Sequence, residues 1–126
     1  MIKVGVIGAG HLGKIHLNLL EKSKKYKLIG FHDNDKKNVQ ELSKSNKYKY
    51  YKSPEELIDK VDMVDIVTPT VSHHKIAIMS INMGKHVFIE KPIANNLQQA
   101  KEITSLASKK GVLGQVGHVE RFNPGF

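Results

Sequence analysis

Apolar residues in this chain fall into short runs of strand length, separated by stretches in which apolar residues recur at helical spacing. Five apolar runs predict strands, at residues 2–7, 26–32, 63–67, 87–89 and 112–116, and the alternating segment at residues 47–52 predicts a sixth, at the edge of the sheet. The intervals between them carry helical periodicity or helix-capping residues. Because strands and helices alternate, each crossover is expected to be right-handed. The sequence therefore predicts an α/β fold, with a doubly wound, mainly parallel six-stranded sheet in a single domain.

Capping residues mark several of the predicted helix boundaries. Asp35 is suited to begin a short, mostly polar helix, and Ser53 followed by Pro54 is a strong helix start. Gly84 and Gly111 are suited to end the two later helices, because glycine adopts a left-handed conformation at low cost. These signals place the loops that connect the predicted sheet.

The turn after the first predicted strand carries the most informative motif. Its glycines follow the spacing Gly8-x-Gly10-x-x-Gly13 and lead straight into a helix. The first allows a tight turn, the second lets the backbone approach a pyrophosphate, and the third lets helix and strand pack closely. The alternative is a βαβ unit that binds another ligand or none. The position of the motif between a predicted strand and a predicted helix favours a Rossmann domain. In that interpretation a dinucleotide is bound by Gly8, Ala9, Gly10, His11, Leu12 and Gly13.

The second predicted strand ends at Asp33, twenty positions after Gly13. A carboxylate there is expected to accept hydrogen bonds from both adenosine ribose hydroxyls and to repel a 2′-phosphate. Asn34, its neighbour, belongs to the same predicted cofactor site. Lys36 and Lys37 follow closely and are able to accommodate a 2′-phosphate. The predicted cofactor is therefore NAD, and NADP is not excluded.

Polar and charged residues also follow the later strands. Ligands of parallel sheets bind at the carboxyl ends of strands, so these residues are expected to converge with the Gly-rich turn. They are Thr68, Pro69, Thr70, Glu90, Lys91, Pro92 and residues 118–121. Lys91 is able to hold a substrate hydroxyl or transfer a proton, with Glu90 tuning its pKa, or it forms a surface salt bridge beside a turn proline. His73, at a helix start, either hydrogen-bonds the cofactor or is a capping or exposed residue.

Composition sets limits on the function. The 126 residues, 40% hydrophobic and 25% charged, suit one globular domain. The net charge is +8, but the lysines are dispersed and Arg121 is the only arginine, which favours solvated surfaces over nucleic-acid binding. The chain has no cysteine and its histidines lack metal-ligand spacing, so no metal is predicted. No signal peptide or membrane span is indicated, and the predicted location is cytoplasmic.

Three strings together resemble the glucose–fructose oxidoreductase/inositol dehydrogenase (Gfo/Idh/MocA) family of NAD(P)-dependent sugar and polyol oxidoreductases. They are the Gly8–Gly13 turn with Asp33, the pattern Thr68-Pro69-Thr70-x-x-His73-x-x-x-Ala77, and the string Gly84-Lys85-His86-Val87-Phe88-Ile89-Glu90-Lys91-Pro92. The last string is highly specific, and the resemblance covers essentially the whole chain.

The resemblance implies a role for each matching residue. Gly8 to Gly13 would hold the pyrophosphate and Asp33 the adenosine ribose, and the cofactor cleft would be lined by Thr68, Pro69, Thr70 and His73. Glu90 would lie near the nicotinamide ribose. Lys91 would contact the substrate hydroxyl being oxidised, aimed by Pro92, which is often cis in such proteins. Arg121 would face the nicotinamide or the substrate. The sequence of residues 117–124 most resembles family members that act on nucleotide-linked sugars.

The resemblance also predicts the domain organisation. Residues 1–116 would form the dinucleotide-binding domain, and residues 117–126 would begin the connection to a second domain. Family members carry that second domain for substrate contacts and oligomerisation, so this chain is expected to bind cofactor without turnover and to form a homo-oligomer only with the missing part. A nucleotide-binding regulatory or sensor module is the alternative function, and a basic nucleic-acid-binding domain is a third.

Overall fold

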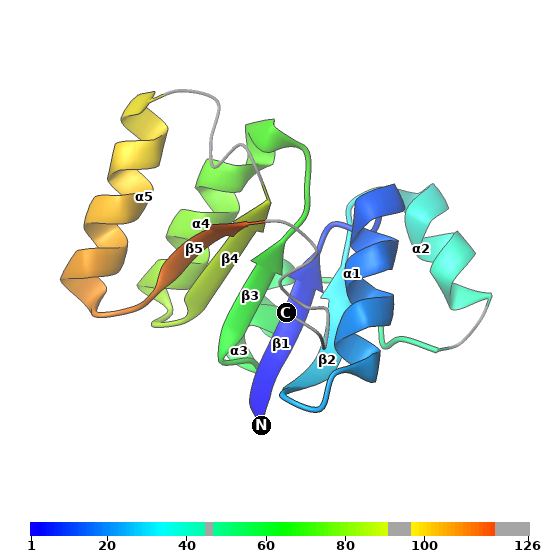
Figure 1. The fold of residues 1–126 in the computed structure, drawn as a ribbon. Helices are drawn as coiled ribbons and strands as arrows, with labels where there is room; N and C mark the ends of the chain where they lie inside the picture. Colours follow the sequence, from blue (N-terminus) through cyan, green and yellow to red (C-terminus); the bar gives the residue numbers. More distant parts are fainter. Residues whose placement is uncertain (45–46, 91–96, 118–126) are drawn as a thin grey trace.

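The computed structural model describes residues 1–44, 47–90 and 97–117, and it builds them around one parallel sheet (Figure 1). The sheet has five strands among the described residues, in the order β2-β1-β3-β4-β5. Their bounds are β1 Ile2–Ile7, β2 Tyr26–His32, β3 Met63–Ile66, β4 His86–Glu90 and β5 Gly114–Gly117. Every pairing between neighbouring strands is parallel, as the alternation of strands and helices predicts.

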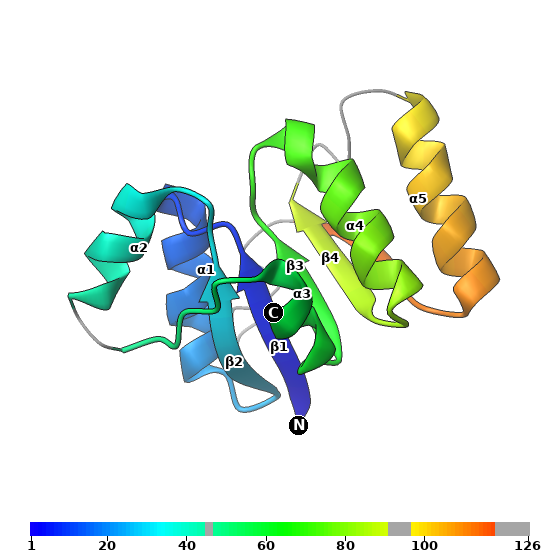
Figure 2. The same ribbon diagram turned by 180° about the vertical axis from the view of Figure 1, so that it is seen from behind.

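Helices cover both faces of the sheet, as the two opposite views show (Figures 1 and 2). One face carries α1 His11–Lys22 and α2 Lys36–Ser43. The other carries α3 Pro54–Asp59, α4 His73–Asn82 with the preceding 3₁₀ turn Thr70–Ser72, and α5 Leu97–Lys110. This layered arrangement confirms the doubly wound α/β class.

Alternating strand residues feed two separate cores. Val4 and Val6 of β1 face α1 and α2, where they pack with Leu17 and Leu20. The opposite face of the sheet packs Val64 and Ile66 of β3 against α3 and α4. Because side chains alternate along a strand, one continuous apolar run supplies both cores.

The prediction of six strands is wrong for residues 47–52. This segment forms one isolated bridge, between Phe31 and Tyr50, with Phe31 N donating to Lys49 O at 2.9 Å and Tyr51 N donating to Phe31 O at 2.8 Å. The reason is topological: the segment connects α2 on one face to α3 on the other, so it crosses the edge of β2 and does not continue along it (Figure 2). Tyr51 of this segment is nevertheless buried.

The carboxyl ends of β1 and β3 mark the point where the chain reverses its direction of winding. From β1 the sheet grows to β2 on one side and to β3 on the other. Gly8 N donates to His32 O at 2.9 Å and Val67 N donates to Ile7 O at 2.8 Å, which ties the three strand ends together. In open parallel sheets such a switch point is where ligands bind.

Candidate functional site

The Gly-rich turn leaves no room for side chains at two of its glycines. Gly8 has a φ of +111°, and a Cβ there would lie 2.6 Å from the carbonyl carbon of Val67. A Cβ on Gly13 would lie 2.0 Å from the carbonyl oxygen of Gly8. The turn therefore packs against β3 and α1 through bare backbone, as the sequence predicts for the first and third glycines.

Gly10 differs from these two glycines because its missing side chain faces open space. The nearest atom to a Cβ on Gly10 would be Nδ2 of Asn38, at 4.0 Å. Gly10 is also the N-cap of the twelve-residue helix α1, where it offers no side-chain acceptor to the first N–H groups. An anion approaching here meets backbone donors and the positive end of the helix dipole.

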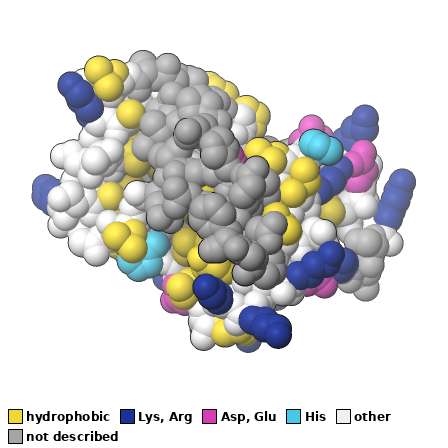
Figure 3. Space-filling view, viewed as in Figure 1, with side chains coloured by type: hydrophobic (Ala, Val, Ile, Leu, Met, Phe, Trp, Pro, Cys, Tyr) yellow, Lys and Arg dark blue, Asp and Glu magenta, His cyan; other side chains and the backbone are white. Residues whose placement is uncertain are grey.

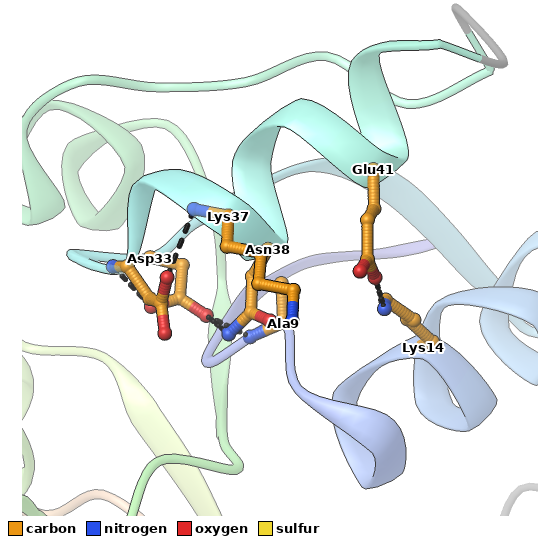
Figure 4. A network of polar contacts seen from close by, with 7 residues as sticks. Ala9, Lys14, Asp33, Lys37, Asn38 and Glu41 are labelled. Atoms are coloured by element: carbon orange, nitrogen blue, oxygen red, sulfur yellow. Dashed lines mark hydrogen bonds and ion pairs between the residues drawn. The ribbon is translucent and has the colours of Figure 1, made fainter.

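The Asp33 carboxylate holds the Gly-rich turn in place (Figure 4). Its Oδ2 accepts from Ala9 N at 2.7 Å and from Nδ2 of Asn38 at 2.9 Å, while its Oδ1 accepts from Asp35 N at 2.9 Å. The sequence pointed to Asp33 as a ribose ligand but missed this structural role, and it missed Asn38. One carboxylate thus joins the turn, the end of β2 and the start of α2.

A cavity of about 470 Å³ opens beside Asp33 at the carboxyl edge of the sheet. Asp33 and Asn34 line it from the end of β2, and Thr68 and Pro69 line it from the loop after β3. Oγ1 of Thr68 is buried and has no hydrogen-bond partner among the described residues. A buried hydroxyl without a partner is costly, so this oxygen fits a polar atom of a bound ligand.

His73 is drawn into the backbone of this edge. Its ring is buried, with 2% of its surface exposed, and Nε2 lies 2.8 Å from the carbonyl oxygen of Thr68, to which it donates. The side chain therefore supports the loop between β3 and α4, and the exposed alternative is excluded. Its contact with a cofactor stays a prediction.

A second polar cluster lies between α1 and the sheet, and the sequence did not predict it. Nδ1 of His16 lies 2.5 Å from Oδ2 of Asp65, and Nε2 of His16 lies 3.0 Å from Oε1 of Glu90. Burial raises the pKa of the Asp65 carboxyl. Burial alone would lower the pKa of His16, but its hydrogen bond and its attraction to Asp65 outweigh this and raise it. A histidine at an inward helix position and an aspartate inside a buried strand were the available signals.

Several predicted site residues lie outside the described part of the chain. They are Lys91, Pro92 and Arg121, together with residues 118–120 of the same strand-end group. Their catalytic and substrate-binding roles stay predictions. Of the remaining residues, His11 and Leu12 begin α1 and Thr70 begins the 3₁₀ turn, all at the carboxyl edge of the sheet.

On the face seen in Figure 3, the Lys side chains of the described residues stand in separate groups around the rim. Across residues 1–44, 47–90 and 97–117, no helix has both the length and the apolar character needed to cross a membrane. Within the same ranges, no group of three or more His, Cys, Asp or Glu side chains is arranged to hold a metal ion.

A Gly-rich turn, a carboxylate after the second strand and a cavity at the switch point together define a dinucleotide-binding domain of the Rossmann type. The sequence pattern of the Gfo/Idh/MocA family, described as an oxidoreductase family with an NAD-binding Rossmann fold, matches residues 2–118. The chain belongs to this family, which confirms the resemblance and, at the level of the family, the predicted cofactor.

Known relatives cover the chain almost completely. It is 31% identical to UDP-N-acetylglucosamine 3-dehydrogenase of Acidithiobacillus ferrooxidans, over 98% of this chain and 39% of the relative. It is 31% identical to scyllo-inositol 2-dehydrogenase (NAD(+)) of Bacillus subtilis, over 99% of this chain and 38% of the relative. Among solved structures, biliverdin reductase of Synechocystis with biliverdin and NADP+ superposes with a TM-score of 0.86 at 28% identity, over 94% of this chain and 38% of that one.

These comparisons describe a part of a larger architecture. The chain spans about two fifths of the length of each of these relatives. The matched part is the NAD-binding part, and two of the relatives are dehydrogenases of a nucleotide sugar and a cyclic polyol.

Proposed function

We propose that this chain is the cofactor-binding part of an NAD-dependent dehydrogenase that acts on a hydroxyl group of a sugar or polyol. The observation that carries the proposal is the convergence of the open Gly10 position, the Asp33 carboxylate and the Thr68 hydroxyl on one edge of the sheet. The two dehydrogenase relatives support the substrate class.

Each residue of the site has a physical task in this proposal. The turn at Gly10 and the N-terminus of α1 bind the pyrophosphate, and Asp33 binds the adenosine ribose. When bound, the nicotinamide ring accepts or returns the hydride of the reaction. Lys91 assists removal of the proton from the substrate hydroxyl, and Arg121 faces the nicotinamide or the substrate.

Assembly and location follow from the same proposal. The relatives extend well beyond the matched region. In this proposal a second domain supplies most substrate contacts and the oligomer interface, so these 126 residues by themselves would bind cofactor without turnover. We place the protein in the cytoplasm, where a soluble dehydrogenase meets its cofactor pool.

Calorimetric titration of the chain with NADH and then NADPH tests the cofactor assignment. We expect saturable binding of NADH. Binding of NADPH should be weaker, because Asp33 would repel its 2′-phosphate. Binding of neither cofactor would contradict the proposal for this chain. Tighter binding of NADPH would show that attraction of the 2′-phosphate by Lys36 and Lys37 outweighs its repulsion by Asp33.

The catalytic assignment needs the complete gene product. Replacing Lys91 by Ala should lower kcat at least ~100-fold with a smaller change in KM, because a general acid–base group contributes roughly that much. Unchanged turnover would remove Lys91 from the mechanism. A gene product that binds NADH but oxidises none of a panel of sugars and polyols would instead support a nucleotide-binding regulatory module.

A further inference from the structure

His16, Asp65 and Glu90 form a buried row of hydrogen bonds that joins α1, β3 and β4. The side chains of His16 and Asp65 have no exposed surface, whereas that of Glu90, the last residue of β4, is 10% exposed. The row thus begins inside the core and reaches the surface at the carboxyl edge of the sheet. We propose that His16, held by Asp65, is a positioning residue that fixes the Glu90 carboxylate at the nicotinamide end of the cofactor cleft. This inference rests on the proposed function.

The strand order indicates which half of a dinucleotide Glu90 would meet. Asp33 follows β2 at one edge of the sheet, and the Gly-rich turn follows β1 beside it. Glu90 ends β4, which lies two strands beyond β1 on the opposite side from β2. With the adenosine at Asp33 and the pyrophosphate over β1, the remaining half extends toward β3 and β4, since neighbouring strands are about 4.8 Å apart.

Hydrogen-bond chemistry fixes the number of protons in the row. An ionised carboxylate only accepts, so both ring nitrogens of His16 must donate if Asp65 and Glu90 are both ionised, which requires an imidazolium. If the ring is neutral, one of the two carboxyls must itself carry a proton. In either arrangement the row holds two protons and a net charge of −1. Where Glu90 is the ionised carboxylate, Nε2 of His16 donates to it and the contact is charge-assisted.

Burying these three ionisable side chains in the core costs free energy. His16 is adjacent to Leu17 and one turn from Leu20, which are buried apolar residues of the same helix. Oδ1 of Asp65 is buried and has no hydrogen-bond partner among the described residues. Apolar side chains in place of such a buried ionic group are often neutral or stabilising. We therefore look for the benefit of the group in the orientation of Glu90, the one member of the row whose side chain is partly exposed.

Two substitutions at His16 separate its two contacts. The amide nitrogen of Gln reaches roughly the position of Nε2, so His16→Gln retains a donor toward Glu90. The amide nitrogen of Asn corresponds to Nδ1, so His16→Asn retains the contact with Asp65 and loses Glu90. His74→Gln is a matched control, because His74 makes an exposed 2.7 Å pair with Glu102 and neither residue lines the cavity beside Asp33.

The test is titration of the chain and its variants with NADH and with ADP, which lacks the nicotinamide half. We expect His16→Asn and Glu90→Gln each to weaken NADH binding about tenfold and ADP binding less than twofold, with no further loss in the double variant. His16→Gln and His74→Gln should bind both ligands within about threefold of the unaltered chain.

The outcomes separate this inference from the proposed function. An unaltered chain that binds neither NADH nor ADP would overturn the proposed function itself. Equal weakening of both ligands in His16→Asn, or of neither, would show that His16 only stabilises the fold. If His16→Asn fails to fold, Glu90→Gln still decides, because losses of NADH and ADP binding that are equal would overturn the placement of Glu90.

Discussion

At the scale of single residues, Asp33 carries two tasks with one carboxylate. It accepts from the backbone of Ala9 and Asp35 and from the side chain of Asn38, and it borders the cavity proposed for the adenosine. A carboxylate has about four lone-pair sites, so three protein donors leave capacity for a ribose hydroxyl. Cofactor affinity and local stability are therefore coupled at this residue.

Replacing Asp33 by Ala should weaken NADH binding at least ~10-fold and also lower the free energy of unfolding by about 1–3 kcal/mol, because partly buried donors lose a charged acceptor. Asp62→Ala is the control. Its carboxylate accepts from Lys3 N at 2.9 Å at the opposite end of β1, so this variant should lose stability without losing NADH affinity. Calorimetry and urea unfolding measure the two effects. An Asp33→Ala variant with unchanged affinity would remove the ribose assignment.

The sequence predicts the residues whose function follows from their spacing along the chain. It does not predict those whose function follows from the contacts they make when buried in the folded protein. Gly8, Gly13 and Asp33 stand at fixed offsets from the first strand, so the turn and its carboxylate were predictable. His16 and Asp65 are 49 positions apart, and only the packing of α1 on β3 brings their side chains together. A pattern of apolar positions shows that both are buried but not which polar group each one meets.

At the scale of elements, the strand, turn and helix at the start of the chain separate folding from binding. Gly8 and Gly13 are needed for the packing of the turn, whereas Gly10 faces open space. The three glycines of one motif should therefore respond differently to the same substitution.

Gly10→Ala should change the free energy of unfolding by less than about 1 kcal/mol, because its φ is −73° and a Cβ meets no close atom. The added methyl would occupy the approach path of the pyrophosphate, so NADH affinity should fall at least ~10-fold. Gly84→Ala is the control: its φ is +79° and a Cβ meets no atom within 4 Å, so it should lose about 1 kcal/mol of stability and no affinity. Retained NADH affinity in Gly10→Ala would place the pyrophosphate elsewhere.

The start of α3 offers a simpler test of an element. Oγ of Ser53 accepts from Glu56 N at 3.3 Å, as the sequence predicts for this N-cap. Ser53→Ala should cost about 1 kcal/mol of unfolding free energy in a urea titration. Ser105→Ala, at an exposed position within α5, should change it by less than about 0.5 kcal/mol. Equal effects of the two substitutions would show that the cap contributes nothing.

The segment at residues 47–52 shows where prediction of elements reaches its limit. Its alternating tyrosines and lysines are compatible with an edge strand, and Tyr50 does bridge to Phe31. Whether a segment continues along a sheet or crosses its edge depends on the faces occupied by the helices before and after it. That choice is set by the whole topology, which local periodicity does not contain.

At the scale of the whole molecule, the buried row of His16, Asp65 and Glu90 makes folding a proton-binding reaction. The unfolded chain releases the second proton of the row as its histidine titrates near pH 6.5. The folded chain keeps that proton to higher pH, because the pKa values of His16 and Asp65 are both raised. Exposed Glu41, Glu55 and Glu102 have pKa values lowered by Lys14, Ser53 and His74, but they titrate in acid, far from this range.

The stability of the chain should therefore fall as pH rises above about 6.5, at up to ~1.4 kcal/mol per pH unit, until the folded row has lost its extra proton. The sign follows from the raised pKa of His16: its contribution is complete below the unfolded value and disappears as pH passes the folded value. Asp65→Asn is the informative variant, because its amide can donate to Nδ1 of a neutral ring while Nε2 still donates to Glu90. This variant needs no extra proton, so its urea unfolding curve between pH 6 and 9 should be nearly flat. The same slope in both proteins would mean that the row carries only one proton, so that His16 does not hydrogen-bond to both carboxylates at once.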